Sequence, residues 1–510
     1  MNGKQLKNSI LQWAIQGKLV PQDPNDEPAS MLLERIRVEK EKLIKEKKIK
    51  KDKNESIIYR GEDNSYYEKF LATGEVKCID EEIPFEIPQG WEWERIGNVF
   101  FVTKLAGFEY TKFFTKEALS ASNPIPIVRA QNVRMGFFEE NKNEAISEIL
   151  SNQLERSALN KKCLLMTFIG AGIGDTCIFP AERKNHLAPN VAKIEPLDDS
   201  ISLDYAVFAL MSPCGQRGVN AIKKSTAQPS LSMETIRKLL IPIPPLKEQK
   251  CISLKLSEAL PLVEKYSKVQ EEQNQLNVEI QYLLKKSILQ EAIQGKLVPQ
   301  IAEEGTAQEL LEQIKTEKEK LVKDGKLKKS ALTDSVIFKG DDNKYYERIN
   351  GQIIEIELPF EYPNNWSVLR LKDICQLIDG EKRNGKDICL DAKYLRGKSS
   401  ATIVEKGKFV YAGDNIILVD GENSGEVFTV PQDGYVGSTF KQLWLSSAMW
   451  KPYILAFILF YKEELRNSKR GAAIPHLNKE LFYNLLIGIP PLAEQQRIAE
   501  RVNELSQLLK

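Results

Sequence analysis

The chain has 510 residues, which suggests about two to four domains, because a single hydrophobic core rarely grows beyond about 250–300 residues. Its 42% hydrophobic and 28% charged residues are typical of a globular protein. The net charge of +1 excludes a global electrostatic field that would hold the chain on DNA or on a membrane, so any anion-binding surface must be local.

Metal-binding and membrane-spanning patterns are missing from the sequence. The seven cysteines form no CxxC pair, and the only histidines are His186 and His476. We therefore expect reduced thiols and no metal site. The N-terminal segment has no unbroken apolar core, and the apolar stretch YILAFILFY at 453–461 is too short to span a bilayer. These features predict a cytoplasmic protein without a membrane partner, in which 453–461 forms a buried helix.

The first segment of the chain opens a repeat. LKNSILQWAIQGKLVPQ at 6–22 aligns with LKKSILQEAIQGKLVPQ at 284–300, and the two differ only at Asn8/Lys286 and Trp13/Glu291. A repeat of about half the chain is too long for a solenoid, whose repeats have about 20–50 residues. It indicates a pseudo-twofold molecule, which suits a pseudo-twofold partner or target.

Amphipathic helices are predicted next, beginning near Leu32 and, in the second copy, near Leu310. Each ends in a basic run, at 45–53 and 323–329, as the helix dipole favours. These runs fit either a solvated helix end or a contact with phosphate or a partner, and the sequence leaves both open. The repeat continues through two aligned pairs: IIYRGEDNSYYE (57–68) with VIFKGDDNKYYE (336–347), and PFEIPQGWEWERIGNV (84–99) with PFEYPNNWSVLRLKDI (359–374).

The segments near 100–225 and 375–470 then diverge, apart from a shared glycine pattern. Agreement returns at LLIPIPPLKEQ (239–249) and LLIGIPPLAEQQRIA (485–499). Two modules that differ in content are therefore mounted in the same way. The shared glycines are Gly170 and Gly174 in the first module and Gly421 and Gly425 in the second.

A long helix is predicted after Pro245. As a helix, residues 262–290 would be about 43 Å long, and their apolar stripe requires a partner helix in a coiled coil. The chain end at 492–510 aligns with the start of this central segment, and the chain start aligns with its end. We therefore expect the two termini to lie close together and to rebuild a second, antiparallel helical connector. The stripe consists of Leu262, Tyr266, Val269, Leu276, Ile280 and Leu283.

No catalytic motif stands out in the chain. IGAGIG at 169–174 resembles a glycine-rich cofactor loop, but Pro180 and AERKNHLAP follow where a dinucleotide-binding fold requires a helix N-terminus. Turn glycines between strands explain the motif better. The adenine-methyltransferase signature, the Walker phosphate loop and paired nuclease carboxylates are missing, so we expect no catalytic residue and no cofactor site in this chain.

Polar and basic clusters in the two modules are candidates for DNA contact. Arginine can bind guanine in bidentate fashion, and asparagine or glutamine can bind adenine, but the same residues also fit solvated loops. Each module is only slightly basic, so its basic groups must be concentrated on one face. The candidates are Arg129, Gln131, Asn132, Arg134, Lys223, Lys224 and Gln228 in the first module, and Lys382, Arg383, Lys386, Arg396, Lys398, Ser438, Thr439 and Lys441 in the second.

The doubled AIQGKLVPQ, IPIPPLKEQ with IGIPPLAEQQRIA, and PFEIPQGWEWERIGNV resemble the specificity subunit of Type I restriction–modification enzymes over essentially the whole chain. The resemblance implies an α+β fold, in which two mixed α/β target-recognition domains are separated by long antiparallel coiled-coil helices with pseudo-twofold symmetry. The implied parts are an N-terminal helical conserved region (1–80), recognition domain 1 (81–245), a central conserved region with the long helix (246–356), recognition domain 2 (357–491) and a C-terminal helix (492–510).

The same resemblance implies a non-catalytic subunit that binds double-stranded DNA, two methyltransferase subunits and restriction/motor subunits. S-adenosylmethionine would sit in the methyltransferase subunits, and ATP and magnesium in the motor–nuclease subunit. Independently of the family, a helical spacer of roughly 40 Å is close to one turn of B-DNA, about 34–36 Å, so two different readers would address two different half-sites. Two alternatives remain open: a helical scaffold whose modules bind proteins and that has no DNA role, and a methyltransferase fused to its own reader.

Overall fold

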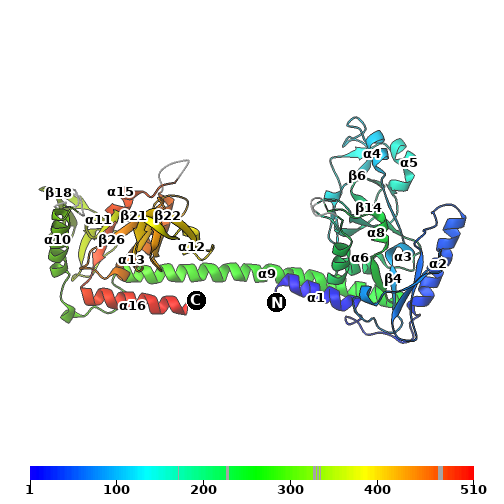
Figure 1. Cartoon of the computed structure of the whole chain (residues 1–510), viewed down its shortest axis with the longest axis horizontal. Coiled ribbons are helices and arrows are strands. Elements are labelled where there is room, and N and C mark those ends of the chain that lie inside the picture. Colours follow the sequence, from blue (N-terminus) through cyan, green and yellow to red (C-terminus); the bar gives the residue numbers. More distant parts are fainter. Residues whose placement is uncertain are drawn as a thin grey trace. The chain divides into compact units, whose positions relative to one another are not determined.

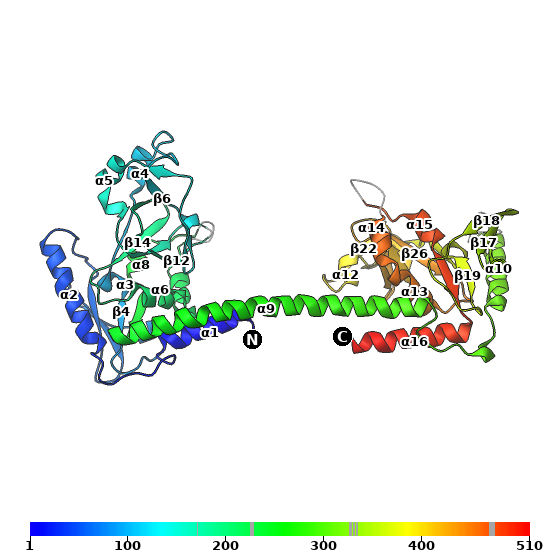
Figure 2. The ribbon, with the colours of Figure 1, turned by 180° about the vertical axis from the view of Figure 1, so that it is seen from behind.

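The computed structural model describes residues 1–510 apart from 171, 225–228, 326–328, 330–331, 333–334, 469–474 and 510. Its helices and strands form two units, Met1–Gln273 and Asn274–Lys510, and each unit holds one copy of the sequence repeat (Figures 1 and 2). Both units mix helices with mostly antiparallel strands, as predicted. No helix in the described part of the chain is long and apolar enough to cross a membrane.

Unit 1 begins with two helices and a small sheet, continues with a recognition domain and ends in the long helix α9. The recognition domain contains one antiparallel sheet, ordered β12-β11-β14-β5, and a second sheet, ordered β10-β13-β6-β9. The elements of unit 1 are α1 (Gly3–Ile15), α2 (Ala29–Lys45), β1 (Ser56–Arg60), β2 (Tyr66–Phe70), β3 (Val76–Cys78), η1 (Asp80–Glu82), β4 (Glu92–Arg95), α3 (Ile96–Val99), β5 (Phe100–Lys104), α4 (Gly107–Phe113), β6 (Ile125–Val128), η2 (Ala130–Asn132), β7 (Val133–Arg134), β8 (Phe137–Phe138), β9 (Ala145–Ile146), α5 (Glu148–Gln153), η3 (Glu155–Ser157), β10 (Ala158–Leu159), β11 (Cys163–Thr167), β12 (Thr176–Phe179), β13 (Asn185–Leu187), β14 (Val191–Pro196), α6 (Leu203–Met211), α7 (Pro213–Ala221), α8 (Met233–Arg237), β15 (Leu240–Ile243) and the first part of α9 (Leu246–Ile293).

Unit 2 contains the end of α9 and repeats the plan with a different recognition domain. That domain has one sheet ordered β20-β26-β23-β24 and a small closed barrel of β21, β22 and β25. Its elements are η4 (Ala302–Glu304), α10 (Gln308–Lys323), β16 (Ser335–Lys339), β17 (Tyr345–Ile349), β18 (Gln352–Ile356), β19 (Ser367–Arg370), α11 (Leu371–Ile374), β20 (Cys375–Ile378), β21 (Glu381–Cys389), α12 (Ala392–Leu395), β22 (Thr402–Val410), β23 (Asn415–Leu418), β24 (Val427–Thr429), β25 (Gly434–Val436), β26 (Phe440–Leu445), α13 (Lys451–Phe460), α14 (Lys462–Asn467), α15 (Lys479–Asn484), β27 (Leu486–Ile489) and α16 (Leu492–Leu508).

Each recognition domain starts and ends in one two-stranded ladder. β4 pairs with β15 in unit 1, where Arg95 lies opposite Leu240, and β19 pairs with β27 in unit 2, where Arg370 lies opposite Leu486. The chain therefore leaves and re-enters the repeated frame at adjacent backbone positions. The five predicted part boundaries stay predictions, although both ladders lie inside the predicted recognition domains.

Two antiparallel helix pairs build the helical part of the frame. In unit 1, α1 lies against the first part of α9 so closely that a Cβ at Gly3 would lie 2.3 Å from Cβ of Ser267. In unit 2, the end of α9 lies beside α16, and Ile293 shares a core with Ile498 (Figures 1 and 2). Gly3 and Leu508 belong to different units, so closure of the two termini into a second connector stays a prediction.

The predicted apolar stripe on the long helix is not a buried seam. All six of its residues are exposed, with fractions between 44% at Tyr266 and 64% at Leu262. Instead, α9 packs into unit 1 through Ile252, Leu256 and Val263, which are at most 6% exposed. No residue of α9 between 264 and 288 is buried, so the prediction that a partner helix within this chain covers the stripe is wrong. The predicted buried helix, by contrast, is confirmed as α13 with its buried apolar face.

The repeated PPLxEQ signature locks each helix pair to its recognition domain. The Glu248 carboxylate accepts hydrogen bonds from Trp91 Nε1 at 2.8 Å and from Gln22 Nε2 at 3.3 Å. The matching Glu494 accepts from Trp366 Nε1 at 3.1 Å and from Gln300 Nε2 at 2.6 Å. Burial raises the pKa of both carboxyl groups. The KLVPQ segment and the tryptophan are thus repeated because, in each unit, their side chains donate to one buried carboxylate.

The next glutamine of the signature satisfies backbone groups at two elements. Gln249 Oε1 accepts from the N–H of Ser202, at the start of α6, while its Nε2 donates to the Pro244 carbonyl, both at 2.9 Å. Gln495 makes the same two contacts in unit 2, with Trp450 and with Pro490. Since a buried backbone group without a partner costs free energy, this amide fixes the start of the following helix in both units.

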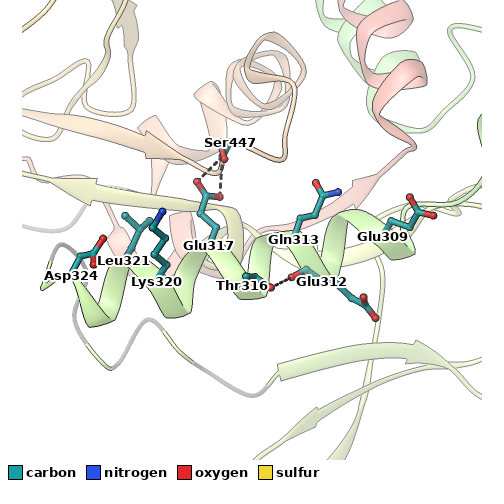
Figure 3. A pocket seen from close by; sticks show the side chains of 9 residues that line it. All are labelled: Glu309, Glu312, Gln313, Thr316, Glu317, Lys320, Leu321, Asp324 and Ser447. Carbon is teal, nitrogen blue, oxygen red and sulfur yellow. Dashed lines mark hydrogen bonds between the residues drawn. The ribbon is translucent and has the colours of Figure 1, made fainter.

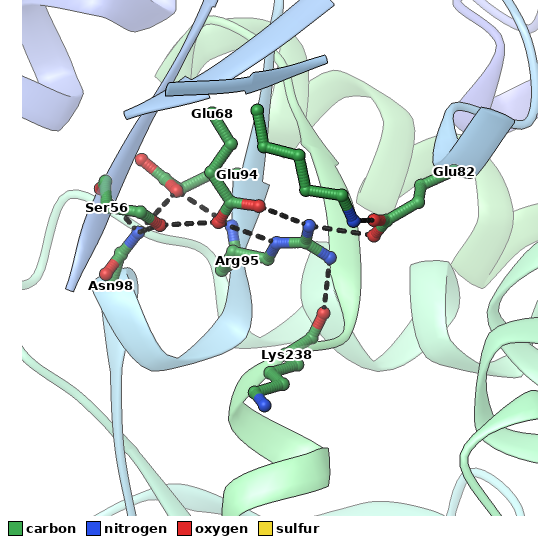
Figure 4. A network of polar contacts seen from close by, with 8 residues as sticks. Ser56, Glu68, Glu82, Glu94, Arg95, Asn98 and Lys238 are labelled. Atoms are coloured by element: carbon green, nitrogen blue, oxygen red, sulfur yellow. Dashed lines mark hydrogen bonds and ion pairs between the residues drawn. The ribbon is translucent and has the colours of Figure 1, made fainter. Parts of the chain in front are cut away.

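An arginine at the end of each ladder ties the small sheet to the recognition domain (Figure 4). The guanidinium of Arg95 donates to both carboxylate oxygens of Glu68, at 3.1 and 2.6 Å, and to the Lys238 carbonyl at 2.8 Å. Arg370 makes the equivalent contacts with Glu347 and with the Asn484 carbonyl. These paired networks show that the two frames match in their polar interior as well as in sequence.

Unit 1 also buries an ionisable group that unit 2 lacks. Glu94 is 2% exposed, and burial raises its pKa from 4.5 to about 7, although Asn98 and the Arg95 N–H donate to its carboxylate. The matching residue in unit 2 is Leu369. Because the folded state favours the protonated form, its stabilisation is present below about pH 4.5 and is lost as the pH rises through 7.

We expect Glu94→Gln to flatten the pH dependence of unfolding, because the amide carries no charge at any pH. Relative to the unmodified chain, the variant should gain roughly 3 kcal/mol in free energy of unfolding between pH 4.5 and pH 8, since one pKa unit corresponds to about 1.36 kcal/mol. Urea unfolding at a series of pH values measures this difference. Glu86→Gln, at an exposed carboxylate of the same unit, is the matched control. Parallel curves for the Glu94 variant and the unmodified chain would contradict the expectation.

Candidate nucleic-acid interface

The shared glycines form a tight turn between two strands in each recognition domain. Gly170 and Gly174 lie between β11 and β12 with φ values of +113° and +93°, and Gly421 and Gly425 lie between β23 and β24 with +100° and +96°. Such positive φ values favour glycine. Each turn joins two paired antiparallel strands, so the prediction that these are turn glycines between strands is confirmed.

Basic side chains from three elements surround the first glycine turn. The carboxyl group of Asp175, in that turn, has a pKa raised by burial but lowered by the positive charges of Arg134 and Lys223. Lys104, at the end of β5, places its Nζ 4.9 Å from the ring centre of Phe168. The structure thus brings Arg134 and Lys223 together from two separate predicted motifs. We call Lys104, Arg134 and Lys223 the first basic cluster.

Of the other candidates in the first domain, two are held by hydrogen bonds within the fold and two are exposed. Arg129 donates to both carboxylate oxygens of Glu144, at 2.5 and 2.9 Å, and Asn132 is buried, with its Oδ1 accepting from the Arg129 N–H. Gln131 is exposed and, with Arg134, lines an open hollow of about 600 Å³. Lys224 is exposed. Gln228 lies outside the described residues.

In the second domain, strand β21 carries three of the candidates. Lys382 and Lys386 are exposed. Arg383 lies over the rings of Phe409 and Tyr411, at 4.4 and 5.2 Å from their centres. Its guanidinium also donates to the Glu381 carboxylate at 2.7 Å. Arg383 is therefore held in place by its own domain.

A shared carboxylate joins β22 to β26. Asp379 accepts a hydrogen bond from Lys441 at 2.7 Å and one from Lys408, and these bonds lower its pKa to about 2. The remaining candidates are spread over other loops. Arg396 pairs with Glu426, while Lys398, Ser438 and Thr439 are exposed.

Three lysines that are not among the predicted residues, Lys104, Lys406 and Lys408, lie beside these candidates. Lys104 gave no local signal, because the strands that bring it to the glycine turn are far apart in the sequence. Lys406 and Lys408 alternate along one strand, which is a period-2 pattern that places both on one face of a sheet. That pattern could have found them.

A wide hollow in unit 2 has the wrong charge for DNA. It measures about 850 Å³ and runs along α10 (Figure 3). Glu317 in its wall accepts from the Ser447 N–H at 3.0 and 3.1 Å. Carboxylates without matching cations repel phosphate, so we exclude this surface as a DNA-binding face. The charged residues in its lining are Glu309, Glu312, Glu317, Asp324 and Lys320.

A family model of the Type I restriction modification DNA specificity domain matches this chain twice, at residues 88–280 and 363–510. The two matches cover more than half of the chain, and each contains one PPLxEQ signature and the ladder that bounds one recognition domain. This chain belongs to the Type I restriction–modification DNA specificity family.

Two curated relatives of this chain are specificity subunits of Type I restriction enzymes. The specificity subunit of the Type I restriction enzyme EcoAI from Escherichia coli is 27% identical over 577 residues, which cover 99% of this chain and 89% of the relative. The EcoEI specificity subunit, also from Escherichia coli, is 27% identical over 74% of this chain and 62% of its own length. The HsdS subunit from Thermoanaerobacter tengcongensis, a solved structure, has 16% identity and a TM-score of 0.46 over 84% of this chain and 92% of that chain.

Membership of the specificity family makes recognition of DNA target sequences the function of this chain. These matches give no support to the alternative of a helical scaffold without a DNA role. Among the described residues, no group of three or more histidine, cysteine, aspartate or glutamate side chains is arranged to hold a metal ion.

Proposed function

We propose that this chain selects the target sequence of a Type I restriction–modification complex, and that each recognition domain reads one half of a split, asymmetric DNA site. One observation carries the proposal: the two units share the same frame, down to the Glu248 and Glu494 locks, but present different surfaces on their recognition domains. Two different recognition domains on two matching frames suit two different half-sites.

The matched frames also suit two copies of the same partner. We propose that one methyltransferase subunit docks on each frame, that restriction/motor subunits complete the complex, and that the helices set the number of unread bases between the half-sites. The chain itself would be non-catalytic. S-adenosylmethionine would be held by the methyltransferase subunits, and ATP and magnesium by the motor–nuclease subunits. Because the proposed partner is double-stranded DNA, the proposed location is the cytoplasm.

The test is to map methylation in a host without DNA methylation. The chain is co-expressed with its cognate methyltransferase subunit, and the modified bases are located by sequencing the genome. We expect a split, non-palindromic motif that is absent when the methyltransferase subunit is expressed alone. A stable complex of the two proteins that methylates no motif would contradict the proposal, and a single undivided motif would contradict the two-reader arrangement.

A further inference from the structure

The second recognition domain contains a two-stranded ribbon formed by β21 and β22. Their pairing is antiparallel, from Glu381 opposite Phe409 to Cys389 opposite Thr402, with an irregularity between Asn384 and Asp387. β25 pairs with one end of each strand and closes the small barrel. The ribbon is therefore anchored at both ends.

One face of the ribbon packs inward on Tyr435. A Cβ added at Gly407 would lie 2.9 Å from Cβ of Tyr435, so only glycine fits there without displacing that ring. Phe409, two residues along the strand, has its ring centre 5.5 Å from that of Tyr435. Because side chains alternate across a strand, Lys406 and Lys408 point away from Tyr435. Val410, next on that face, is buried, so the exposed part of the face ends at the lysines.

The outward face collects lysines around one asparagine. In the ladder, Lys382 lies opposite Lys408 and Asn384 lies opposite Lys406. Like charges directly opposite each other destabilise a ladder. Asp379 compensates Lys408, but the exposed Lys382 and Lys406 have no acidic partner within the described part of the chain, and the Asn384 side chain has no hydrogen-bond partner there.

We propose that this ribbon enters the major groove of the second half-site and reads it with its outward face. The major groove of B-DNA is about 12 Å wide and admits a two-stranded ribbon. In that position the free amide of Asn384 matches the N6 donor and N7 acceptor of an adenine, while Lys382 and Lys406 neutralise phosphates. The inference rests on the proposed function and adds the groove, the element and the base.

Arg383 has a different role on the ribbon. Its guanidinium is engaged by two aromatic rings and the Glu381 carboxylate on the inner side, so it is a positioning residue that holds β21 against β22. The amide of Asn384, and not the guanidinium next to it, then faces the base edge.

The first experiment replaces Asn384 by alanine in the full complex with the methyltransferase subunit. We expect discrimination at one A·T position of the second half-site to fall roughly 5- to 150-fold, since a good bidentate pair is worth about 1–3 kcal/mol. The first half-site serves as the internal control and should keep its sequence. Asn384 is exposed, so its replacement removes no packing.

The groove is tested with 7-deazaadenine, which lacks the N7 acceptor in the major groove. At the affected position it should weaken binding by the unmodified complex but have no further effect on the Asn384→Ala complex. Equal losses for both complexes would overturn the assignment of this contact to Asn384. Unchanged binding of the unmodified complex would show that the N7 atom at this position is not contacted, and it would overturn the proposed major-groove contact.

The phosphate contacts are tested with Lys382→Gln and Lys406→Gln. Each should weaken binding to all sequences alike and reduce the slope of log K against log salt by about 1. Lys451→Gln, at an exposed lysine of the same unit outside the ribbon, is the matched control and should leave the slope unchanged. If a split motif is found but the ribbon variants change neither the second half-site nor the slope, the ribbon inference fails while the proposed function stands.

Discussion

Replacing Trp366 by alanine is expected to destabilise unit 2 by roughly 3–5 kcal/mol, the usual cost of deleting a buried tryptophan. Trp366 is 7% exposed, stacks on Tyr362 and meets Tyr453 edge-on. The substitution would leave a cavity between these rings. It would also remove the Nε1 donor from the buried Glu494 carboxylate, whose pKa is already raised by burial. A buried carboxylate with fewer donors adds to the loss.

The measurement is urea unfolding of the full chain, followed by far-UV circular dichroism. Trp450→Ala is the matched control, because Trp450 is 38% exposed and contacts Gln495 only through its backbone N–H, which the substitution keeps. We expect the control to shift the transition far less than Trp366→Ala. Similar shifts for the two variants would show that the lock around Glu494 does not stabilise the unit.

Lengthening the long helix should change the DNA sequence that is recognised. Four helical residues inserted after Val278 add about 6 Å, or about two base pairs at a rise of about 3.4 Å per base pair. Val278 is exposed on α9, between the part that packs on α1 and the part that lies beside α16, so the insertion leaves both helix pairs intact. We expect methylation mapping to return the same two half-sites with a longer spacer.

Two further variants separate length from rotation and from local damage. At about 100° per residue, four residues also rotate the following part of the helix by about 40°, whereas seven residues rotate it by only about 20° and add about 10.5 Å. The seven-residue insertion should lengthen the spacer by about three base pairs. Val278→Ala, which changes no length, should leave the spacer as it was. An unchanged spacer in both insertion variants would refute the proposal that the helix sets the spacing.

Much of the frame could be predicted from the sequence because its interactions are repeated. The two copies of KLVPQ and PPLxEQ indicated identical mounts, and the structure supplies the reason in the carboxylates of Glu248 and Glu494. The turn glycines were predictable as well, because the requirement for positive φ restricts the residue type at single positions. The exposure of the stripe on α9 was not predictable, since helical spacing alone does not tell whether a partner helix lies within the chain.

The candidate site was only partly predictable, because a side chain's type does not reveal its partner. Arg129 is a residue type expected at a DNA contact, but its guanidinium donates to the carboxylate of Glu144, fifteen positions away. Arg396 is paired in the same way with Glu426. Conversely, the alternation of Lys406 and Lys408 is visible in the sequence, but only the ladder sets Lys406 opposite Asn384. Which basic groups remain available is decided by tertiary pairing that no local motif encodes.

The ladders β4–β15 and β19–β27 make each recognition domain an insertion between two paired strands. The frame pairs with each domain through two neighbouring backbone positions. It also uses one backbone N–H inside the domain, because Gln249 accepts from Ser202 and Gln495 accepts from Trp450. A foreign domain grafted between Arg95 and Leu240, or between Arg370 and Leu486, would therefore have to supply that N–H. Under the proposed function, new target sequences would arise by inheritance of whole recognition domains.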